Sequence, residues 1–358
     1  MEKMLRITDE IAKKYHIKFG QEKSKIMAIG KTKGEKRYQL GDMEIEKTDS
    51  YKYLGVLINN KNNMKDHIKA TRAKCEAAYQ TMMAICGDSE LRGIQLEAAW
   101  KIIEACIQPI LTYGAEAMNP NKTETKELNR IWTNIIKRLL MTPQSTPNET
   151  IFIETGTLDF ETMMDINKMR MASRITENHN PLLETTVADQ TKGGWNDKIN
   201  QLMQKYYITG EDMEKPQKTR DKIITQKIYS AFKQKIETQA LEKSKVQTLL
   251  ENTQSRWVPK KRKPYMSKLT RTQASTIFRA RTRMTKVKHN YKNQYTDQKC
   301  RKCKAQDETL KHVIQECKYI HPDEKTKENW ESIYNEQPNK LKNTASKISE
   351  AIKHLNNV

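Results

Sequence analysis

The chain has 358 residues, of which 36% are hydrophobic and 30% are charged, and its mean hydropathy is −0.88. This composition predicts two or three compact units with narrow apolar stripes as cores, and it excludes a membrane-spanning segment. Sixty-five lysines and arginines against 44 acids leave a net charge of +21, which favours a polyanionic partner. Because the N-terminus lacks a secretory signal, we expect an intracellular protein, nuclear or cytoplasmic, whose six cysteines are thiols or metal ligands.

The N-terminal part of the sequence predicts a small α+β region. Residues 5–15 have helical spacing, and residues 25–29 have the composition of a short strand. Alternating apolar residues on both sides of Gly41 and Asp42 predict a β-hairpin. The apolar run from Tyr53 to Ile58 has the length and β-branched composition of one further strand.

Beyond Asn63 the apolar spacing becomes helical and predicts three helices that pack together. We expect the second to end at Pro109, because proline cannot donate a helix hydrogen bond. The third carries a wide apolar stripe from Leu128 to Leu140 and stops before Pro143. Three cysteines fall on apolar helical faces and are interpreted as small core residues, namely Cys75, Cys86 and Cys106.

The later part of the chain also predicts helices. Helical spacing is present in residues 160–175 and 223–250, and the residues after Pro322 are compatible with one or two docked helices. Residues 178–194 contain Asn-His-Asn-Pro and a Gly-Gly pair, so they mark a candidate boundary between two blocks.

Four potential metal ligands cluster near the C-terminus in a C-x2-C-x8-H-x4-C pattern, namely Cys300, Cys303, His312 and Cys317. This pattern is typical of a tetrahedral zinc site, although four ordinary cytosolic side chains remain the alternative. Because four protein ligands leave no position for a bound water, the zinc is expected to be structural. Residues 299–319 hold few apolar side chains, so zinc would supply their folding free energy.

The spacing of the last two ligands sets a geometric condition. We expect His312 on a short helix over residues 308–315. Positions 312 and 317 lie about 140° apart on an ideal α-helix, so that helix must tighten or end before Cys317. His321 is an alternative ligand in place of Cys317.

The segment before the ligand cluster is strongly basic, since Asp297 is its only acid between Arg256 and Lys304. If residues 267–287 form one helix, the side chains of residues 279, 283 and 286 share a face that can contact phosphates. Arg281 then falls on the apolar face. There its stem can be buried with its guanidinium paired to an acid, and this role is at least as well supported as contact with a ligand. The candidate nucleic-acid contacts are Lys260, Lys261, Arg262, Lys263, Arg271, Arg279, Arg283, Lys286, Lys288 and Lys292.

Two further readings of this segment stay open. Residues 260–263 could also act as a nuclear import signal. The aromatic side chains of the segment could stack on unpaired bases or belong to a core. They are Tyr265, Phe278, Tyr291 and Tyr295.

Four stretches resemble the C-terminal part of the reverse transcriptases of non-LTR (LINE-like) retrotransposons. Lys-Ser-Lys-Ile-Met at 23–27 is similar to the late palm strand, and Tyr-Lys-Tyr-Leu-Gly-Val at 51–56 resembles the primer-grip hairpin. Residues 108–114 and 147–156, with Glu-Thr-Gly at 154–156, resemble the thumb and the segment after it. Residues 269–284 with the Cys-Cys-His-Cys pattern resemble the basic helix and zinc-binding end.

The resemblance implies a mainly α fold with a small N-terminal α+β palm-edge remnant. It implies a helical thumb-like bundle, a helical connector and a small zinc-stapled C-terminal module. The corresponding segments are 1–60, 61–178, 179–255, 256–322 and a helical tail at 323–358. An RNA template, DNA primer or target DNA is the implied partner, and the primer-grip-like residues are Tyr51, Tyr53, Leu54 and Gly55.

Two departures from the family pattern bear on activity. Gly20 stands where the family has asparagine, and the sequence contains no Ala-Asp-Asp motif. Two-metal nucleotidyl transfer requires paired carboxylates, so we expect this nucleic-acid-binding fragment not to polymerise without a missing N-terminal polymerase half. A freestanding zinc-dependent DNA- or RNA-binding module and a zinc-stabilised protein-interaction scaffold are the alternatives.

Overall fold

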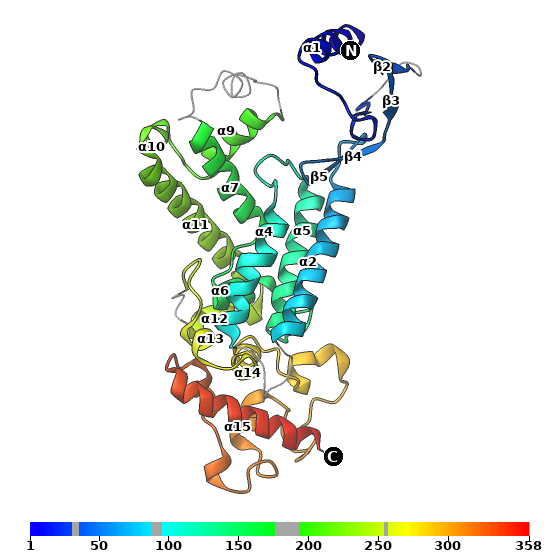
Figure 1. Ribbon diagram of the computed structural model, residues 1–358. Helices are drawn as coiled ribbons and strands as arrows, with labels where there is room; N and C mark the ends of the chain where they lie inside the picture. Colours follow the sequence, from blue (N-terminus) through cyan, green and yellow to red (C-terminus); the bar gives the residue numbers. More distant parts are fainter. Residues whose placement is uncertain (31–35, 87–94, 176–192, 254–256, 358) are drawn as a thin grey trace. The chain divides into compact units, whose positions relative to one another are not determined.

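The computed structural model describes residues 1–30, 36–86, 95–175, 193–253 and 257–357. Helices dominate these residues, as the apolar spacing predicts (Figure 1). The chain divides into two compact units, which are Met1–Lys74 with Asn119–Glu127 and Cys75–Met118 with Leu128–Val358. None of the described helices is both long enough and apolar enough to cross a membrane.

The first unit combines a helix with short strands. Its elements are α1 (Glu2–Lys14), η1 (Gln21–Lys23), β1 (Lys25–Ile26), β2 (Tyr38–Leu40), β3 (Met43–Lys47), β4 (Ser50–Tyr53) and β5 (Val56–Asn59). The central β3 pairs in parallel with β1 and antiparallel with β2, and α1 packs against β2. Leu40 pairs with Met43 around Gly41 and Asp42, so the predicted first hairpin is confirmed.

The apolar run from Tyr53 to Ile58 forms part of a second hairpin, so the single strand predicted from its composition is wrong. Tyr53 pairs with Val56 across a two-residue turn in which Leu54 and Gly55 have φ values of 45° and 88°. Positive φ at both central residues matches the twist of the paired strands. An uninterrupted apolar run concealed this turn because Leu54, unlike glycine, rarely adopts a positive φ.

The second unit contains most of the helices. α2 (Lys65–Cys86) and α5 (Lys122–Leu139) contribute their first residues to the first unit and the rest to the second. The others are α3 (Leu96–Ile102), η2 (Ile103–Ile107), α4 (Gln108–Thr112), α6 (Asn148–Thr155), α7 (Phe160–Ile175), α9 (Trp195–Lys205), α10 (Gly210–Glu214), α11 (Gln217–Leu241), α12 (Ser244–Asn252), α13 (Pro264–Lys268), α14 (Arg271–Arg281), η3 (Lys288–Gln294), η4 (His312–Glu316), η5 (Glu324–Thr326), η6 (Trp330–Tyr334) and α15 (Pro338–Asn356).

The apolar stripe of α5 faces the core of the second unit, as predicted. Trp132, Ile136 and Leu139 are all buried. The Trp132 indole donates to the carbonyl of Leu158 at 3.0 Å, which satisfies its polar group inside the core. The helix ends before Met141, whose φ of 47° breaks the helical path.

The helix expected to end at Pro109 instead continues through it. The π-helical turn η2 stands between α3 and α4, and Pro109 lies in the first turn of α4. A π turn shifts the hydrogen-bond pattern by one residue, and the first turn of a new helical segment tolerates proline because its N–H groups need no partner there. The prediction of a break at Pro109 is therefore wrong.

Two long helices pack side by side in the second unit, namely α7 and α11 (Figure 1). α7 has the predicted bounds, whereas residues 223–250 fall in two helices because the chain turns at Glu242 and Lys243 between α11 and α12. The boundary expected at 178–194 lies almost wholly in residues 176–192, outside the described residues.

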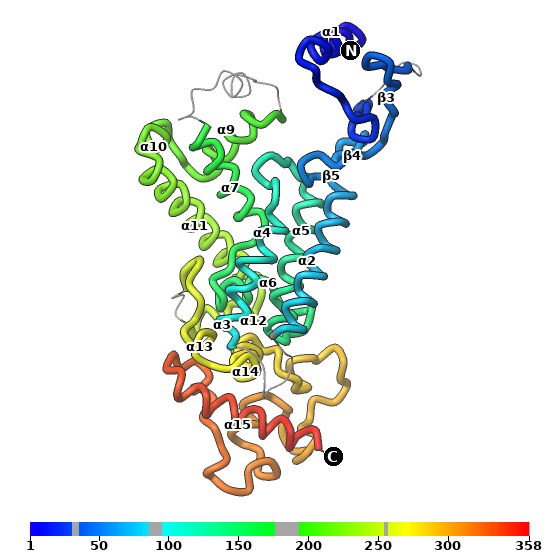
Figure 2. Tube along the Cα trace, viewed as in Figure 1, coloured from blue at the N-terminus to red at the C-terminus, as the bar shows by residue number. Residues whose placement is uncertain are grey.

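The C-terminal elements pack on one another. α15 lies across α14 and also contacts η4, although α14 precedes it by more than fifty residues in the sequence (Figure 2). Buried residues on α15 include Leu341, Ile348 and Leu355. The predicted helical tail is thus a docked helix that covers the segment carrying the metal-ligand candidates.

Candidate metal centre and basic surface

The first two ligand candidates lie on a tight loop. The amide of Cys300 donates to the carbonyl of Gln306 at 2.8 Å, and the amide of Lys304 donates to the carbonyl of Cys300 at 3.0 Å. Lys304 has a φ of 58°, which lets the chain reverse immediately after Cys303. These contacts direct the two thiols toward the same point.

His312 and Cys317 are placed by the end of a helix. The short helix widens into the π turn η4, and the amide of Cys317 donates to the carbonyl of His312 at 2.9 Å. Cys317 itself is extended, with φ −75° and ψ 105°. The ligand spacing predicted that the helix tightens or ends before Cys317. The helix does end at Glu316, but its last turn is wider than an α-helical turn, not tighter.

The four side chains converge on one point. Their ligand atoms all lie within 4.8 Å of one another, with 4.0 Å between the sulfurs of Cys300 and Cys317 and 3.3 Å between the Cys303 sulfur and His312 Nε2. A tetrahedral ion with bonds of about 2.3 Å to sulfur and about 2.0 Å to nitrogen separates two sulfurs by about 3.8 Å. The cluster therefore has the dimensions of a four-coordinate metal site.

Backbone amides surround the thiols. Burial raises the pKa of the Cys303 thiol, but the N–H groups of Gln306 and Ala305 and the His312 ring lower it, and the resulting pKa is about 6. Burial raises the pKa of the Cys317 thiol. A thiolate at Cys303 is the form that coordinates a metal.

The His312 ring lies between the cluster and the carboxylate of Glu316. Its Nε2 faces Cys303, while Nδ1 lies 3.7 Å from a carboxylate oxygen of Glu316, one turn along the same helix. Carboxylates beside the second ring nitrogen orient metal-binding histidines. At 3.7 Å, however, Glu316 forms no hydrogen bond with Nδ1, which is buried without a hydrogen-bond partner among the described residues.

His321 does not belong to the cluster, so its prediction as an alternative ligand is wrong. Its Nε2 lies 2.8 Å from the carbonyl of Val313, and its Nδ1 lies 3.0 Å from the Thr326 hydroxyl. Both ring nitrogens are thus occupied by hydrogen bonds within the fold.

Glu308 anchors the loop that carries Cys300 and Cys303, and the sequence analysis missed it. It is fully buried, and its carboxylate accepts hydrogen bonds from the amides of Lys288 and Arg301 at 2.9 Å. The Arg301 guanidinium also binds it, at 2.8 to 3.2 Å. A buried carboxylate with this many donors fixes the Cys300–Cys303 loop against the segment before it. Glu308 follows the basic segment and stands beside Asp307, so no local sequence pattern marks it.

The basic segment does not form the single helix predicted for residues 267–287. The Thr270 hydroxyl and the Gln273 side chain form a capping box that starts α14 anew after α13, and α14 ends at Arg281. Arg283 has a φ of 55° and lies beyond the helix together with Lys286. The shared helical face expected for Arg279, Arg283 and Lys286 is therefore wrong.

Several predicted phosphate contacts are engaged within the protein. Arg262 pairs with Glu97 and Glu104, both at 3.1 Å. Arg271 donates to the carbonyls of Leu139 and Arg138 at 2.9 and 3.1 Å. Two lysines also form ion pairs, Lys263 with Glu336 at 3.3 Å and Lys288 with Asp297 at 3.0 Å. These side chains hold elements together.

Other basic residues of the segment remain accessible. Lys260, Lys261, Lys286 and Lys292 are exposed. Arg279 and Arg283 are partly exposed, and neither forms an ion pair with any residue that the structure describes. Lys245 of α12 is near enough to Arg283 for the Arg283 charge to lower its pKa, and it was absent from the predicted set because it precedes the basic segment in the sequence.

The aromatic side chains of the basic segment divide between core packing and possible stacking on bases. Tyr265 and Phe278 are buried in the core. Tyr291 is partly buried, and Tyr295 is 41% exposed. Stacking on bases is thus geometrically open only at the last two.

The other cysteines are not all core residues. Cys75 is buried as predicted, whereas Cys106 is exposed, so its assignment to the core is wrong. Cys106 lies in η2, where the widened turn rotates the helix relative to an ideal α-helical pattern. The side chain of Cys86 lies outside the described residues.

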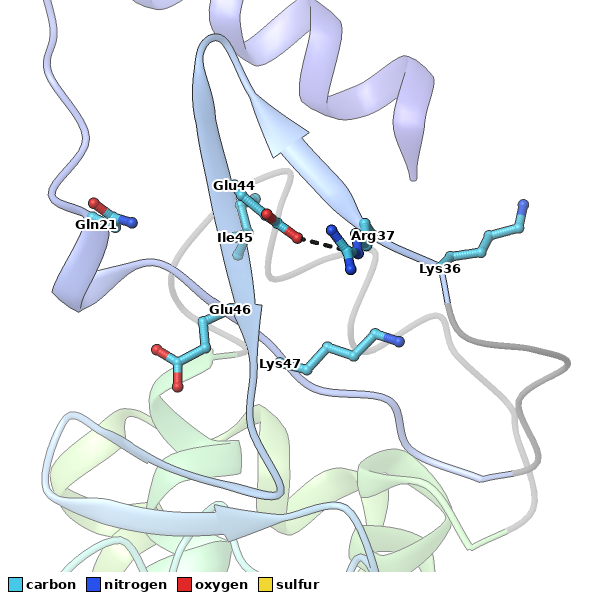
Figure 3. Close-up of a pocket in the computed structure, with 7 residues that line it drawn as sticks. All are labelled: Gln21, Lys36, Arg37, Glu44, Ile45, Glu46 and Lys47. Carbon is cyan, nitrogen blue, oxygen red and sulfur yellow. Dashed lines mark ion pairs between the residues drawn. The ribbon is translucent and has the colours of Figure 1, made fainter.

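The first unit contains a hollow beside β3 that mixes both charge signs (Figure 3). Arg37 points into it toward Glu44, with 3.7 Å between the guanidinium and the carboxylate (Figure 3). Glu46 pairs with Lys25. These two ion pairs leave the hollow with little net charge that could select a ligand.

The tip and base of the primer-grip-like hairpin differ in exposure. Tyr53 and Leu54 are 59% and 74% exposed at its turn, next to Gly55. The hydroxyl of Tyr51 donates to the carbonyl of Lys23 at 2.8 Å. Residues 23–27 and 51–56 are therefore in contact in the first unit.

Comparison of the chain with protein-family models, curated proteins and solved structures finds no match. The functional argument consequently rests on the metal-ligand cluster and on the charged side chains around it.

Proposed function

We propose that the chain binds nucleic acid as the zinc-stapled C-terminal part of a polymerase of the non-LTR reverse transcriptase type. The observation that carries this proposal is the set of accessible cationic side chains in the chain segments that precede the Cys-Cys-His-Cys cluster. Arg279, Arg283 and Lys245 are partly exposed, and none of them forms an ion pair with a carboxylate of the described residues. Uncompensated cations of this kind are the electrostatic footprint of a phosphate backbone.

Zinc is the metal that the ligand set favours. Three thiolates and one imidazole in a tetrahedral arrangement suit Zn²⁺, and carboxylate-seeking ions such as Mg²⁺ or Ca²⁺ do not select sulfur ligands. All four positions are filled by protein, so the ion has a structural role. It holds the Cys300–Cys303 loop on η4, close to the basic residues of the preceding segment.

Contacts between the family-like stretches support the polymerase part of the proposal. The Glu154 carboxylate binds Arg281 at 3.3 Å, which joins the stretch after the thumb to the basic helix. The carbonyl of Gly156 accepts the amide of Lys260 at 2.6 Å in the same region. Stretches that resemble one family at separate places in the sequence therefore pack together within the second unit.

A metal analysis tests the zinc assignment. We expect one zinc per chain after exhaustive dialysis, and we expect Cys303→Ser to lose both the zinc and the hydrogen-exchange protection of residues 299–319. Cys106→Ser is the matched control and should keep both, since Cys106 lies outside the cluster. A zinc content near zero in a chain whose C-terminal region is folded would refute the site.

A binding comparison separates nucleic-acid binding from the scaffold alternative. The zinc-loaded chain is titrated into labelled 20-nucleotide RNA, single-stranded DNA and duplex DNA, with a polyglutamate of equal charge as the matched polyanion. The proposal predicts binding to nucleic acid and much weaker binding to polyglutamate. Equal or stronger binding to polyglutamate would favour a surface for acidic proteins.

A further inference from the structure

We infer that the exposed face of α1 is an interface at which two copies of the chain pair. This inference concerns the first unit and is independent of the proposed nucleic-acid binding, whose residues lie in the second unit. The face carries five large apolar side chains, each 42% to 66% exposed, and we call this set the α1 stripe. Its members are Met1, Met4, Ile7, Ile11 and Tyr15.

The α1 stripe is one continuous surface. Its members stand three or four residues apart, a spacing at which side chains of a helix are neighbours. At about 100° per residue they fall within about 120° of one another around the helix. Single exposed apolar side chains are common on protein surfaces, but a continuous apolar stripe marks a surface that another surface covers.

The packed side of α1 is a different one. α1 packs against β2, and its buried or half-buried residues are Leu5, Thr8, Asp9 and Ala12. A Cβ on Gly41 would lie 2.6 Å from the Asp9 carboxylate, so the turn of the β2–β3 hairpin lies against this side. The stripe is centred about 90° away around the helix. α1 thus has one side that packs within its own unit and an apolar side that remains accessible.

The stripe has the area of one side of a small specific interface. A large apolar side chain exposes about 200 Å² when it is fully accessible, so the five exposed fractions correspond to about 550 Å². Two copies that pair through this face would remove about 1,100 Å² from water, above the roughly 1,000 Å² expected of a specific interface. A second copy of the stripe is therefore a large enough partner.

The charges beside the stripe also favour a second copy. Lys3 and Glu10 lie about 20° apart along one edge of the stripe, and both are exposed. Neither forms an ion pair within the described part of the chain, although Lys13 pairs with Asp9 on the same helix. This edge therefore offers one cation and one anion, about two helical turns apart, to an approaching surface.

The surface complements itself when two α1 helices pack antiparallel. A two-fold axis at Ile7 places Met4 of each copy beside Ile11 of the other. The same axis brings the Lys3 edge of each copy to the Glu10 edge of the other, with about 1.5 Å between their positions along the helix. Apolar side chains then meet apolar side chains, and two ion pairs flank them.

Sedimentation equilibrium of the zinc-loaded chain tests the pairing in the absence of nucleic acid. A reductant is present, which excludes a disulfide through the exposed Cys106. We expect a monomer–dimer equilibrium with a dissociation constant on the order of micromolar, because the interface is small. A chain that stays monomeric at about a hundredfold higher concentration would overturn the inference.

A charge at the two-fold axis tests whether the stripe is the contact. Ile7→Lys places two like charges against each other and should leave a monomer at every concentration. Ile7 is already 42% exposed, so circular dichroism should show an unchanged fold. Tyr207→Lys is the matched control, because Tyr207 is 84% exposed and lies in the second unit, and it should pair like the unaltered chain. Unchanged pairing in Ile7→Lys would overturn the inference.

An exchange of charges tests the antiparallel arrangement. Lys3→Glu and Glu10→Lys each bring like charges together at both edges of the pair, so each variant alone should dimerise at least about fivefold more weakly at low salt. An equal mixture of the two variants should recover the affinity of the unaltered chain, because opposite charges then meet at both edges. A mixture that pairs no better than the separate variants would contradict the proposed interface.

Discussion

Arg281 shows how burial decides the role of a charged side chain. Its side chain is 1% exposed, that of Glu154 is 0% exposed, and the two groups are 3.3 Å apart. Tyr265 donates to the same carboxylate at 2.6 Å, and Arg281 also donates to the carbonyls of Ile333 and Asn335. The reading of Arg281 as a buried stem paired with an acid is confirmed. The sequence could not name Glu154 as the partner, because 127 positions separate the two residues.

Removal of Glu154 should be strongly destabilising. Glu154→Ala leaves the Arg281 charge buried and unpaired, so we expect the free energy of unfolding to fall by about 3–5 kcal/mol. Glu76→Ala is the matched control, because its ion pair with Arg138 is exposed to solvent. That variant should lose no more than about 1 kcal/mol. Urea unfolding at neutral pH measures both, and equal losses would contradict this assignment.

Gly156 is required by both its backbone conformation and its surroundings. Its φ is 66°, and a Cβ at this position would lie 2.4 Å from the carbonyl oxygen of Lys261. We expect Gly156→Ala to cost more than about 1 kcal/mol, because a left-handed conformation alone costs about that much with a Cβ. Gly210→Ala is the control, since Gly210 has open space around it. Thermal unfolding should show a lower Tm only for the first variant.

At the scale of elements, the spacing of apolar residues correctly predicted the regular helices. α7 has the expected bounds and α5 buries the expected stripe, because both helices keep a constant apolar spacing. The interruptions were not predicted from periodicity. The Thr270–Gln273 capping box was visible in the sequence and could have revealed the start of α14. The positive φ values of Leu54 and Arg283 have no sequence signal, since neither residue is a glycine.

α15 should stabilise the metal-ligand cluster that it covers. Arg301, in the loop of Cys300 and Cys303, donates to the side chain of Asn356 at 3.0 Å, and Leu355 beside it is fully buried. We expect Leu355→Ala to destabilise the fold by about 2–5 kcal/mol and to speed zinc release to a chromogenic chelator. Lys353→Ala removes an exposed side chain of the same helix and serves as the control. An unchanged release rate in Leu355→Ala would show that the cluster holds its metal independently of α15.

At the scale of the whole molecule, net charge and ligand spacing were readable from the sequence, but their arrangement was not. The four ligand candidates converge as their spacing predicts. By contrast, Arg262 and Lys263 form ion pairs with acids far away in the sequence, while Lys245 joins the accessible cations from another helix. Local patterns cannot predict such partners because tertiary packing selects them. A count of basic residues therefore overstates how many are available to a ligand.

The central claim is that a zinc-stapled C-terminal region binds nucleic acid. The most direct test is the binding isotherm of one labelled single strand, measured with the zinc-loaded chain and with the same chain after its zinc has been removed. We predict salt-sensitive binding by the zinc-loaded chain and a loss of at least about tenfold in affinity without zinc, because on this proposal zinc would supply the folding free energy of residues 299–319. No binding by the zinc-loaded chain, or identical isotherms with and without zinc, would contradict the claim.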